Sequence, residues 1–469
     1  MTSETTTASA APGGKKRIDK GTFRGALRLA MLLTRGSERR EWWRISLTAL
    51  GAFAATGFAL LAVALGSLRG WVHFPYWHGL LNGEGERRGL VTALLLLLIP
   101  VLGFLGQCAR IGAVHRDRRL AALRLAGAGP RQVRRIATLE SGLACLAGSL
   151  LALAAFCVAV LLLGRVPGPI AWAGFAAVVV LIPVLAAAVS RFALRHVVAS
   201  PLGHVRRVRP RRGPGALLGL FAPAALVIAG AALLALRGLQ SGVTAFPLFV
   251  FAAVVLTGAG SVWVAGVAAK VIGRRLADRT GNPTVLIAAE RLRDDPWAAA
   301  RTHAALLLVT VVGVGFVGVR EILVAGMDRQ QREGTLGDRG FYTAGINLAG
   351  GAVLIALVIS LAGLAVGTAE SLATRRRTLA AQAAAGVPHR VLARTLLLET
   401  ALPLAPALVL AGIGGTAVYV AYGRFVGESI PLMLPLLMPF AVYAACLAAA
   451  ATSLPLLRRS LHPSELRVA

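Results

Sequence analysis

Residues 90–109 read LVTALLLLLIPVLGFLGQCA, and residues 47–68 read LTALGAFAATGFALLAVALGSL. Each stretch has about twenty consecutive residues without a charged side chain, which is the length an α-helix needs to cross a hydrocarbon core of roughly 30 Å. The chain of 469 residues is 57% hydrophobic and only 15% charged, with a mean hydropathy of +0.72. A soluble protein has about a quarter of its residues charged. The sequence therefore predicts an all-α polytopic membrane protein.

Similar apolar stretches recur along the chain and predict ten transmembrane helices. Their approximate ranges are 45–68, 89–112, 137–163, 169–190, 216–236, 245–269, 302–324, 347–368, 395–420 and 431–455. The four cysteines fall in or beside these spans and form no CxxC pair. We therefore interpret them as small apolar residues of the helix interfaces.

The formal net charge of +30 is concentrated in the connections between the predicted spans. If the N-terminus is cytoplasmic, most of the 50 lysines and arginines face the cytoplasm, and the positive-inside rule then places both termini there. No soluble basic domain exists to bind nucleic acid, so the charge favours contact with anionic lipid headgroups. A composition rich in Ala, Arg and Gly but poor in Lys favours a GC-rich bacterial genome, and hence a bacterial plasma membrane.

The chain contains an internal repeat at an offset of 259 residues. Residues 116–140, which we call the first basic loop, read RDRRLAALRLAGAGPRQVRRIATLE, and residues 375–399, the second basic loop, read RRRTLAAQAAAGVPHRVLARTLLLE. The matched pairs are Arg116 and Arg375, Arg118 and Arg377, Gly127 and Gly386, Arg131 and Arg390, and Glu140 and Glu399. An even number of predicted spans separates the copies, so the repeats are parallel and both loops face the cytoplasm.

These copies divide the chain into four segments. Residues 1–22 are Ser/Thr-rich and predict a disordered cytoplasmic tail, and residues 23–212 form the first four-span repeat. Residues 213–271 hold two connecting spans, and residues 272–469 form the second four-span repeat.

Each basic loop predicts a short helix, a turn, and a second helix that continues into the next span. Gly127 and Gly386 suit a helix C-terminus that requires a left-handed backbone. Pro130 and Pro388 lie just beyond, as expected where one helix stops and another starts. The run 375–377 is three arginines, each costing about 2.5–3.5 kcal/mol at the bilayer centre, so it must lie in water or among headgroups.

Both repeats also carry an acidic residue after the turn. Glu140 and Glu399 lie near the predicted cytoplasmic ends of their spans rather than at the bilayer centre. We expect them to cap or order the basic loops.

The segment LRLAGAGPRQVRRIATLES (123–141) has a Glu thirteen residues after its first Gly, and the two repeats end in SPLGHVRR (200–207) and HPSELR (462–467). Together with the Arg-rich entry to each loop, these features resemble the FtsX-like permease family. The resemblance covers both four-span units. It implies the membrane subunit of an ABC transporter of the MacB or BceB type. ATP would be hydrolysed on a separate ATPase, with two copies per permease chain and neither a cofactor nor enzyme activity in this chain.

The resemblance further implies that both basic loops contact this ATPase. The candidate coupling residues are Arg116, Arg118, Arg119, Gly127, Pro130, Arg131 and Glu140 in the first basic loop, and Arg375, Arg377, Gly386, Pro388, Arg390 and Glu399 in the second. Such permeases usually carry a large extracellular domain, but the outer connections 69–88 and 327–346 are too short to form a core. Direct export or extraction of a hydrophobic or amphipathic substrate, such as a lipid, peptide or drug, is therefore favoured.

The sequence contains no motif for ATP binding, metal binding or hydrolysis, since GxxxxGK[ST], HExxH and GxSxG are all missing. Two other functions stay open: a signalling or scaffold protein that an ATPase controls, and a secondary transporter with parallel repeats. The short outer loops argue against a signalling or scaffold protein. The lack of carboxylates at the midpoints of the spans argues against a secondary transporter. We interpret Arg320 and Glu321 as part of a helix extending into water, with a gating pair as the alternative.

Overall fold

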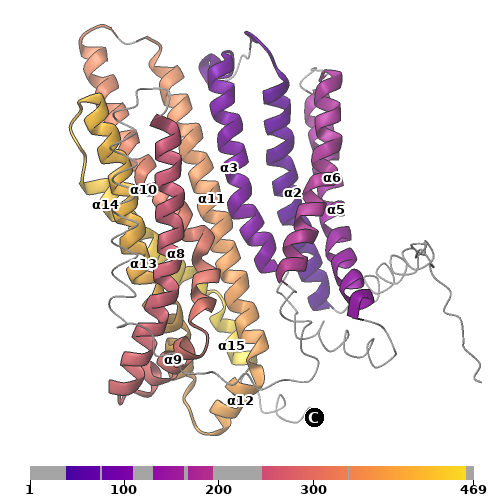
Figure 1. Ribbon diagram of the computed structural model, residues 1–469, viewed down its shortest axis with the longest axis vertical. Coiled ribbons are helices and arrows are strands. Elements are labelled where there is room, and N and C mark those ends of the chain that lie inside the picture. Colours follow the sequence, from indigo (N-terminus) through magenta and orange to yellow (C-terminus); the bar gives the residue numbers. More distant parts are fainter. Residues whose placement is uncertain are drawn as a thin grey trace, which may run out of the picture.

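The computed structural model describes residues 39–73, 77–108, 130–162, 167–193, 246–335 and 337–460. Within these ranges every regular element is a helix, and two groups of long helices stand side by side (Figure 1). Eight of the described helices are long and apolar enough to cross a membrane. The chain is therefore an all-α, multi-pass membrane protein. The fifth predicted span, 216–236, lies outside the described residues, so the prediction of ten spans stays a prediction.

The first group, which we call the N-terminal bundle, has four long helices. They are α2 (Arg39–Ser67), α3 (Glu84–Cys108), α5 (Pro130–Leu162) and α6 (Pro169–Ala193). Helix α2 packs against the other three, and Ala52, Ala55, Val101, Leu105 and Cys145 form the core between them. Three of these residues, Ala52, Ala55 and Cys145, are small. Small residues favour helix association in lipid, which depends on close packing because lipid is as apolar as a helix surface.

The second group, the C-terminal bundle, has more elements. They are α8 (Phe246–Arg279), α9 (Pro283–Asp294), α10 (Pro296–Arg332), α11 (Arg339–Thr374), α12 (Arg376–Ala384), α13 (His389–Val426), α14 (Met433–Ala451) and α15 (Leu454–Ser460). Helix α10 packs against α11, α13 and α14, and α8 covers α10 and α13. The core between them includes Leu306, Leu307, Leu404, Ala407 and Cys446.

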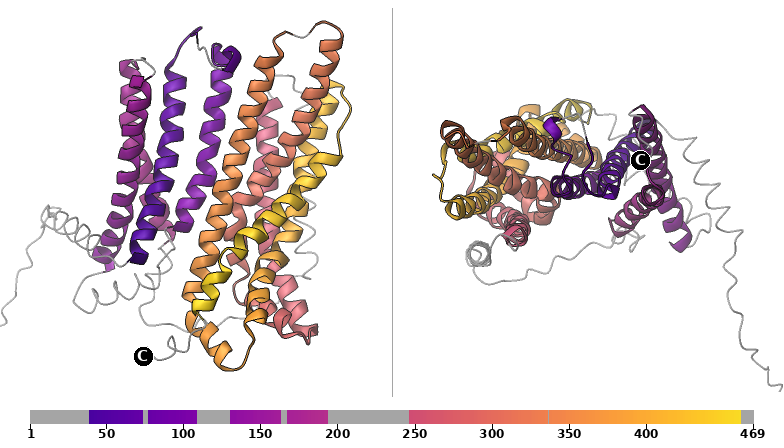
Figure 2. Two further views of the ribbon diagram at one scale, coloured as in Figure 1. Left: turned by 180° about the vertical axis from the view of Figure 1, so that it is seen from behind. Right: turned by 90° about the horizontal axis from the view of Figure 1, so that it is seen from above.

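The two bundles meet mainly through α3 and α11. Ala62, Leu94 and Leu97 of the N-terminal bundle pack there with Val309 and Ala356 of the C-terminal bundle. Seen from above, the bundles lie next to each other with α3 and α11 between their centres (Figure 2). The contact is apolar throughout this cluster, as expected for an interface within the hydrocarbon core.

The long helices α8, α10, α11 and α13 of the C-terminal bundle extend beyond their predicted spans, and the last three do so by the most. Helices α10, α11 and α13 have 37, 36 and 38 residues, or about 55 Å each at 1.5 Å per residue. Hydropathy ends the seventh span at 324, but α10 continues to Arg332, so Arg320 and Glu321 lie within a helix that extends past the apolar segment. Ion pairs between neighbouring elements hold this extension, because Arg339 binds Asp328 at 2.7 Å and Arg329 binds Glu428.

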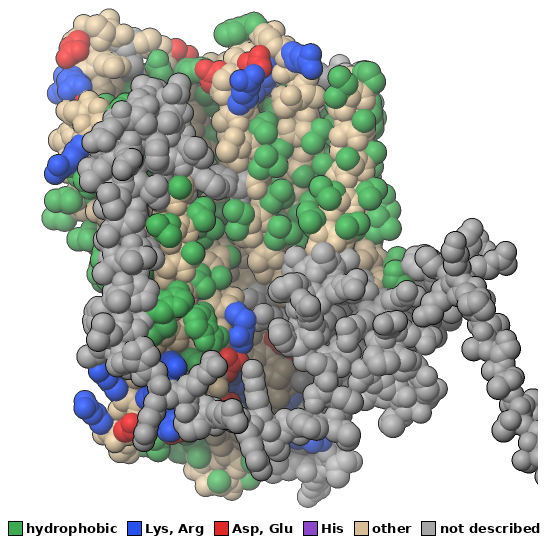
Figure 3. Space-filling view, viewed as in Figure 1, with side chains coloured by type: hydrophobic (Ala, Val, Ile, Leu, Met, Phe, Trp, Pro, Cys, Tyr) green, Lys and Arg blue, Asp and Glu red, His purple; other side chains and the backbone are tan. Residues whose placement is uncertain are grey.

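Charged side chains gather toward the two ends of the molecule. In the face shown in Figure 3, hydrophobic side chains of the described residues fill the band between those ends. One end carries α9, α12 and α15 (Figure 1), and we call it the α12 end. The opposite end carries the short 3-10 helix η1 (Trp77–Gly79), and we call it the η1 end.

A buried arginine organises the connection between α2 and α3 at the η1 end. The side chain of Arg87 is 1% exposed and donates hydrogen bonds to the carbonyl oxygens of Leu81 (2.9 Å), Asn82 (2.7 Å) and Gly70. These bonds tie the end of the connection to its beginning. A guanidinium has five N–H donors in a fixed fork, which suits it to bind several carbonyl oxygens at once.

Replacing Arg87 with Ala is expected to lower the free energy of unfolding by about 2–4 kcal/mol, because several buried carbonyls lose their donors. The thermal unfolding midpoint of detergent-purified protein measures this loss. The matched control is Arg88→Ala, because Arg88 is exposed and pairs only with Glu84 one turn away; its cost should stay below about 0.5 kcal/mol. Equal shifts in the two variants would contradict a structural role for Arg87.

Candidate functional site: the second basic loop

The second basic loop folds as a helix, a turn and a helix, as the sequence predicts. Helix α12 ends at Ala384, and α13 begins at His389. Gly386 has a φ of +89°, which confirms the predicted left-handed backbone at the helix end. The amide of Gly386 donates to the carbonyl of Ala383 at 3.0 Å, and the amide of Val387 to that of Gln382 at 3.1 Å. This pair of bonds is the Schellman motif, which satisfies the last carbonyls of α12.

An apolar cluster fixes the loop to the helices on either side. Leu379 of α12 and Leu392 of α13 are 2% and 1% exposed, and they pack with Leu372 of α11, Leu396 of α13 and Leu457 of α15. The turn is therefore a small packed unit with its own core. Helix α13 continues from this unit to Val426, with Pro403 and Pro406 inside it, so the loop is joined directly to a membrane-spanning helix.

Glu399 is the polar centre of this unit. One carboxylate oxygen accepts from Arg291 of α9 at 2.5 Å, and the other accepts from Arg375, between α11 and α12, at 3.0 Å. Arg291 also donates to Gln382 of α12 at 3.3 Å. The Glu399 side chain is 14% exposed and that of Arg291 16%, so the pair is only weakly screened by water. The predicted ordering role of Glu399 is confirmed: it joins α9, α11, α12 and α13.

The outer surface of the loop is basic with small side chains between the charges. Arg377, Arg390 and Arg394 are exposed, and so is Pro388 in the turn. Ala381, Ala384 and Ala385 are also exposed on α12 and just after it. Such a surface allows close backbone approach by another protein while offering guanidinium groups to acidic side chains.

The first basic loop lies largely outside the described residues. Arg116, Arg118, Arg119 and Gly127 belong to this part of the chain. Pro130 and Arg131 belong to the described part of α5, and the predicted helix restart before them lies outside the described residues. Glu140 lies further along α5 and is 4% exposed.

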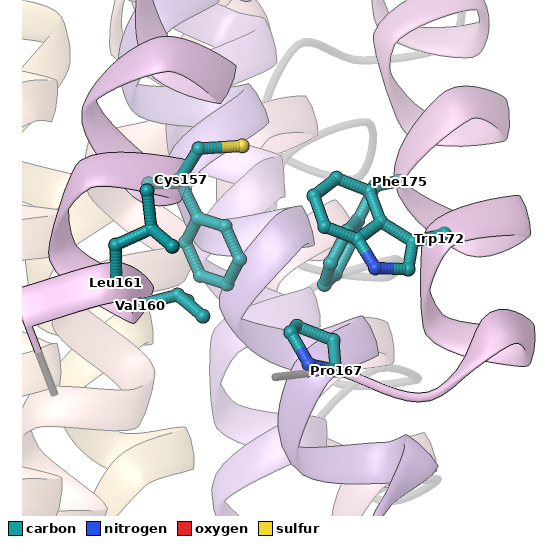
Figure 4. A pocket seen from close by; sticks show the side chains of 7 residues that line it. Cys157, Val160, Leu161, Pro167, Trp172 and Phe175 are labelled. Carbon is teal, nitrogen blue, oxygen red and sulfur yellow. The ribbon is translucent and has the colours of Figure 1, made fainter. Parts of the chain in front are cut away.

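Small hollows lie between the described helices. The first, of about 100 Å³, lies between α5 and α6 near the η1 end and is lined by apolar side chains that include Cys157, Val160, Pro167 and Trp172 (Figure 4). The ring centroids of Trp172 and Phe175 are 5.5 Å apart in an edge-to-face contact. None of the described residues that line this hollow is charged.

The second hollow lies behind the second basic loop. It has a volume of about 90 Å³, and its walls come from the α9–α10 junction, α11 and α13. Arg291, Arg375 and Glu399 line it together with His303, which is 3% exposed. The hollow is therefore continuous with the ion-pair network of the loop.

Sequence reasoning missed Arg291, Gln382 and His303. Arg291 lies 108 residues before Glu399, and no spacing rule connects them. The sequence did indicate that a partner exists, because a carboxylate that is buried at the end of a span requires a cationic partner. Which arginine supplies the charge depends on how α9 folds back against α13.

No protein family matches the sequence of this chain, and no curated protein does so either. The arrangement of the residues themselves must therefore support any functional conclusion.

Proposed function

We propose that the chain is the transmembrane permease subunit of an ABC transporter, driven by a separate ATPase that binds the two basic loops. One observation carries the proposal: the second basic loop is a packed, outwardly basic unit fused to a 38-residue helix. A binding partner that pushes on α12 displaces the part of α13 before Pro403 with it, because Leu392 and Glu399 join the two helices. This is the mechanical connection that an ATP-driven permease requires between its energy source and its membrane helices.

The bundle geometry supports two coupled halves. At the repeat offset of 259 residues, Pro130 of α5 corresponds to His389 of α13. The packing of α2 on α3, α5 and α6 matches that of α10 on α11, α13 and α14. By the same offset α3 corresponds to α11, and these two helices meet at the interface between the bundles. Contact between corresponding helices is what a two-fold arrangement of the halves would give. Two basic loops then present two equivalent sites, one for each of two ATPase copies.

The proposed orientation places the α12 end in the cytoplasm, with both termini on that side. The second basic loop has five arginines and one glutamate, as the positive-inside rule favours for a cytoplasmic connection. The opposite end has short connections, held by pairs such as Arg339–Asp328. We therefore propose export or extraction of a hydrophobic or amphipathic molecule from a bacterial plasma membrane. The substrate would reach the bundles from the lipid rather than through an outer domain.

Charge reversal on the loop surface tests the site. The variant Arg390→Glu/Arg394→Glu is expected to reduce ATPase co-purification at least tenfold, since both side chains are exposed and an acidic partner surface would be repelled. The matched control is Arg69→Glu/Arg332→Glu, which reverses two exposed arginines at the η1 end and should leave co-purification unchanged. The measurement is quantitative immunoblotting of an ATPase retained on the tagged permease in mild detergent.

Stoichiometry distinguishes this proposal from its alternatives. Mass determination of the purified complex is expected to give two ATPase copies per chain. A stable, monodisperse permease that retains no ATPase from its native membrane would contradict the proposal. Ion-gradient-dependent uptake into liposomes by the chain alone would then identify a secondary transporter.

A further inference from the structure

The α12 end of the C-terminal bundle has an apolar core that is separate from the main core of the bundle. On α13, Leu392 and Leu396 belong to the cluster under the second basic loop, whereas Leu404, two turns further on, belongs to the main core. On α11 the same change occurs between Leu364, in the main core, and Leu372, in the cluster. Two packed bodies therefore follow each other along the axis of the bundle.

Helix α13 is interrupted at the boundary between these two cores. Pro403 and Pro406 both lie inside it. Proline has no N–H, so the carbonyl oxygens of Glu399 and Leu402 receive no hydrogen bond from the next turn of the helix. Sharp bends in helices occur where such bonds are missing, because the remaining turns then resist bending less.

Two other connections between the cores are weak at the same level. Helix α14 ends at Ala451, and α15 begins at Leu454, which packs against the cluster under the loop. Helix α11 is continuous, but it has Gly363 and Gly367 here, and glycine weakens a helix interior. We call α12, α15 and residues 389–402 of α13 the loop unit; α12 and α15 lie together at the α12 end (Figure 1).

The second hollow lies between the loop unit and the rest of the bundle. Leu396 and Glu399 line it from the loop unit, and Leu364 of α11 and Ala299 of α10 line it from the other side. Protein interiors are close-packed, so most boundaries between packed bodies leave no room for movement. A hollow of about 90 Å³ at this boundary lets the loop unit tilt without a steric clash.

Helix α9 belongs to the other side of this boundary, because it packs closely on α8. A Cβ atom added to Gly273 of α8 would lie 2.9 Å from the carbonyl oxygen of Ala289. From α9, Arg291 reaches across to the loop unit and binds Glu399 and Gln382. These two polar contacts set the resting position of the loop unit against α9.

We propose that the loop unit is a hinged body, which tilts about Pro403 and Pro406 against the rest of the C-terminal bundle and closes on the hollow. A hinge needs a few residues that absorb the change in backbone angle and space for the moving body. The two prolines provide the former, and the hollow provides the latter. The inference rests on the packing of the described helices and not on the proposed ATPase partner, so it is tested on the chain alone.

The hinge is specific to the second half of the chain. At the repeat offset of 259 residues, Pro403 corresponds to Ala144 and Pro406 to Ala147 of α5. Beyond Pro130, α5 contains no proline, and alanine is the residue most favourable to a helix. The two repeats therefore differ in the bending of the helix that follows each basic loop.

Distances between pairs of spin labels test the hinge in nanodiscs. One pair joins Ala381→Cys, exposed on α12, to Leu50→Cys, which is 58% exposed on α2. The control pair joins Val409→Cys, beyond the prolines on α13, to the same position on α2. All proteins carry Cys157→Ala, because the other three cysteines are buried. We expect the first pair to have a distance distribution at least twice as wide as the control pair. Equal widths would overturn the proposal.

Substitution of the prolines gives the second readout. Pro403→Ala/Pro406→Ala copies the alanines of α5 and is expected to narrow the distribution of the first pair at least twofold. The matched control Pro439→Ala, which changes the interior proline of α14, should leave that width unchanged. Ser371→Leu, which fills the hollow from α11, should narrow it as the double substitution does and serves if the latter does not fold. An unchanged width in either folded variant, or equal narrowing in Pro439→Ala, would overturn the proposal.

Discussion

Replacing Glu399 with Ala is expected to destabilise the protein by about 2–3 kcal/mol and to reduce transport-coupled ATPase activity at least tenfold. The substitution leaves Arg291 and Arg375 without their shared counter-charge. Breaking a fully buried ion pair by removing one partner costs about 3–5 kcal/mol. We expect the smaller loss of about 2–3 kcal/mol for Glu399→Ala because the Arg375 side chain is 37% exposed and water screens part of its charge.

The measurement combines the thermal midpoint of the permease alone with ATPase activity of the assembled complex. Glu290→Ala is the matched control, because Glu290 lies at the same end and pairs with Arg293 across 3.3 Å, but both side chains are about half exposed. This control should cost less than about 0.5 kcal/mol and leave ATPase activity intact. Similar midpoints for the two variants would show that Glu399 does not hold the loop.

The second large effect is expected at the contact between α2 and α5. A Cβ atom added to Gly148 would lie 2.1 Å from the carbonyl oxygen of Ala49, which belongs to the backbone and cannot rotate away. Gly148→Ala must therefore push the two helices apart along their contact. We expect the free energy of unfolding to fall by more than about 2 kcal/mol, as it does in strongly overpacked cores. Little monodisperse protein should remain after solubilisation.

Gly142→Ala is the control on the same helix. No atom lies within 4 Å of its added Cβ, so only the helix propensity changes. Alanine is favoured over glycine inside a helix by up to about 1 kcal/mol, and this variant should be as stable as wild type or slightly more so. Size-exclusion profiles and thermal midpoints distinguish the two. A well-folded Gly148→Ala protein would show that α2 and α5 do not approach as closely as the structure describes.

The membrane character of the fold was predictable because it depends on local composition. Stretches such as 90–109 are apolar over the full width of a bilayer, and no tertiary context changes the cost of leaving a helix of this kind in water. The left-handed turn at Gly386 was predictable for the same reason. A glycine after an Ala-rich helix and two residues before Pro388 terminates the helix by its own backbone preferences.

Helix length was predicted less well. Hydropathy locates the apolar part of α10 but not its continuation to Arg332, because that segment is amphipathic and polar. Its helical structure depends on partners from elsewhere in the chain, such as Arg339 for Asp328 and Glu428 for Arg329.

What the sequence determined by itself is the class of the protein, the positions of the apolar helices it contains, and the helix–turn–helix form of the second basic loop. Each of these follows from interactions between residues a few positions apart. Only the tertiary structure decided that Glu399 binds Arg291 of α9, that α3 meets α11, and that His303 lines a hollow with Arg375. These contacts join residues about 70 to more than 200 positions apart. Their geometry is set by how whole helices pack, through close approaches such as that of Gly148 to Ala49, and local sequence preference does not contain it.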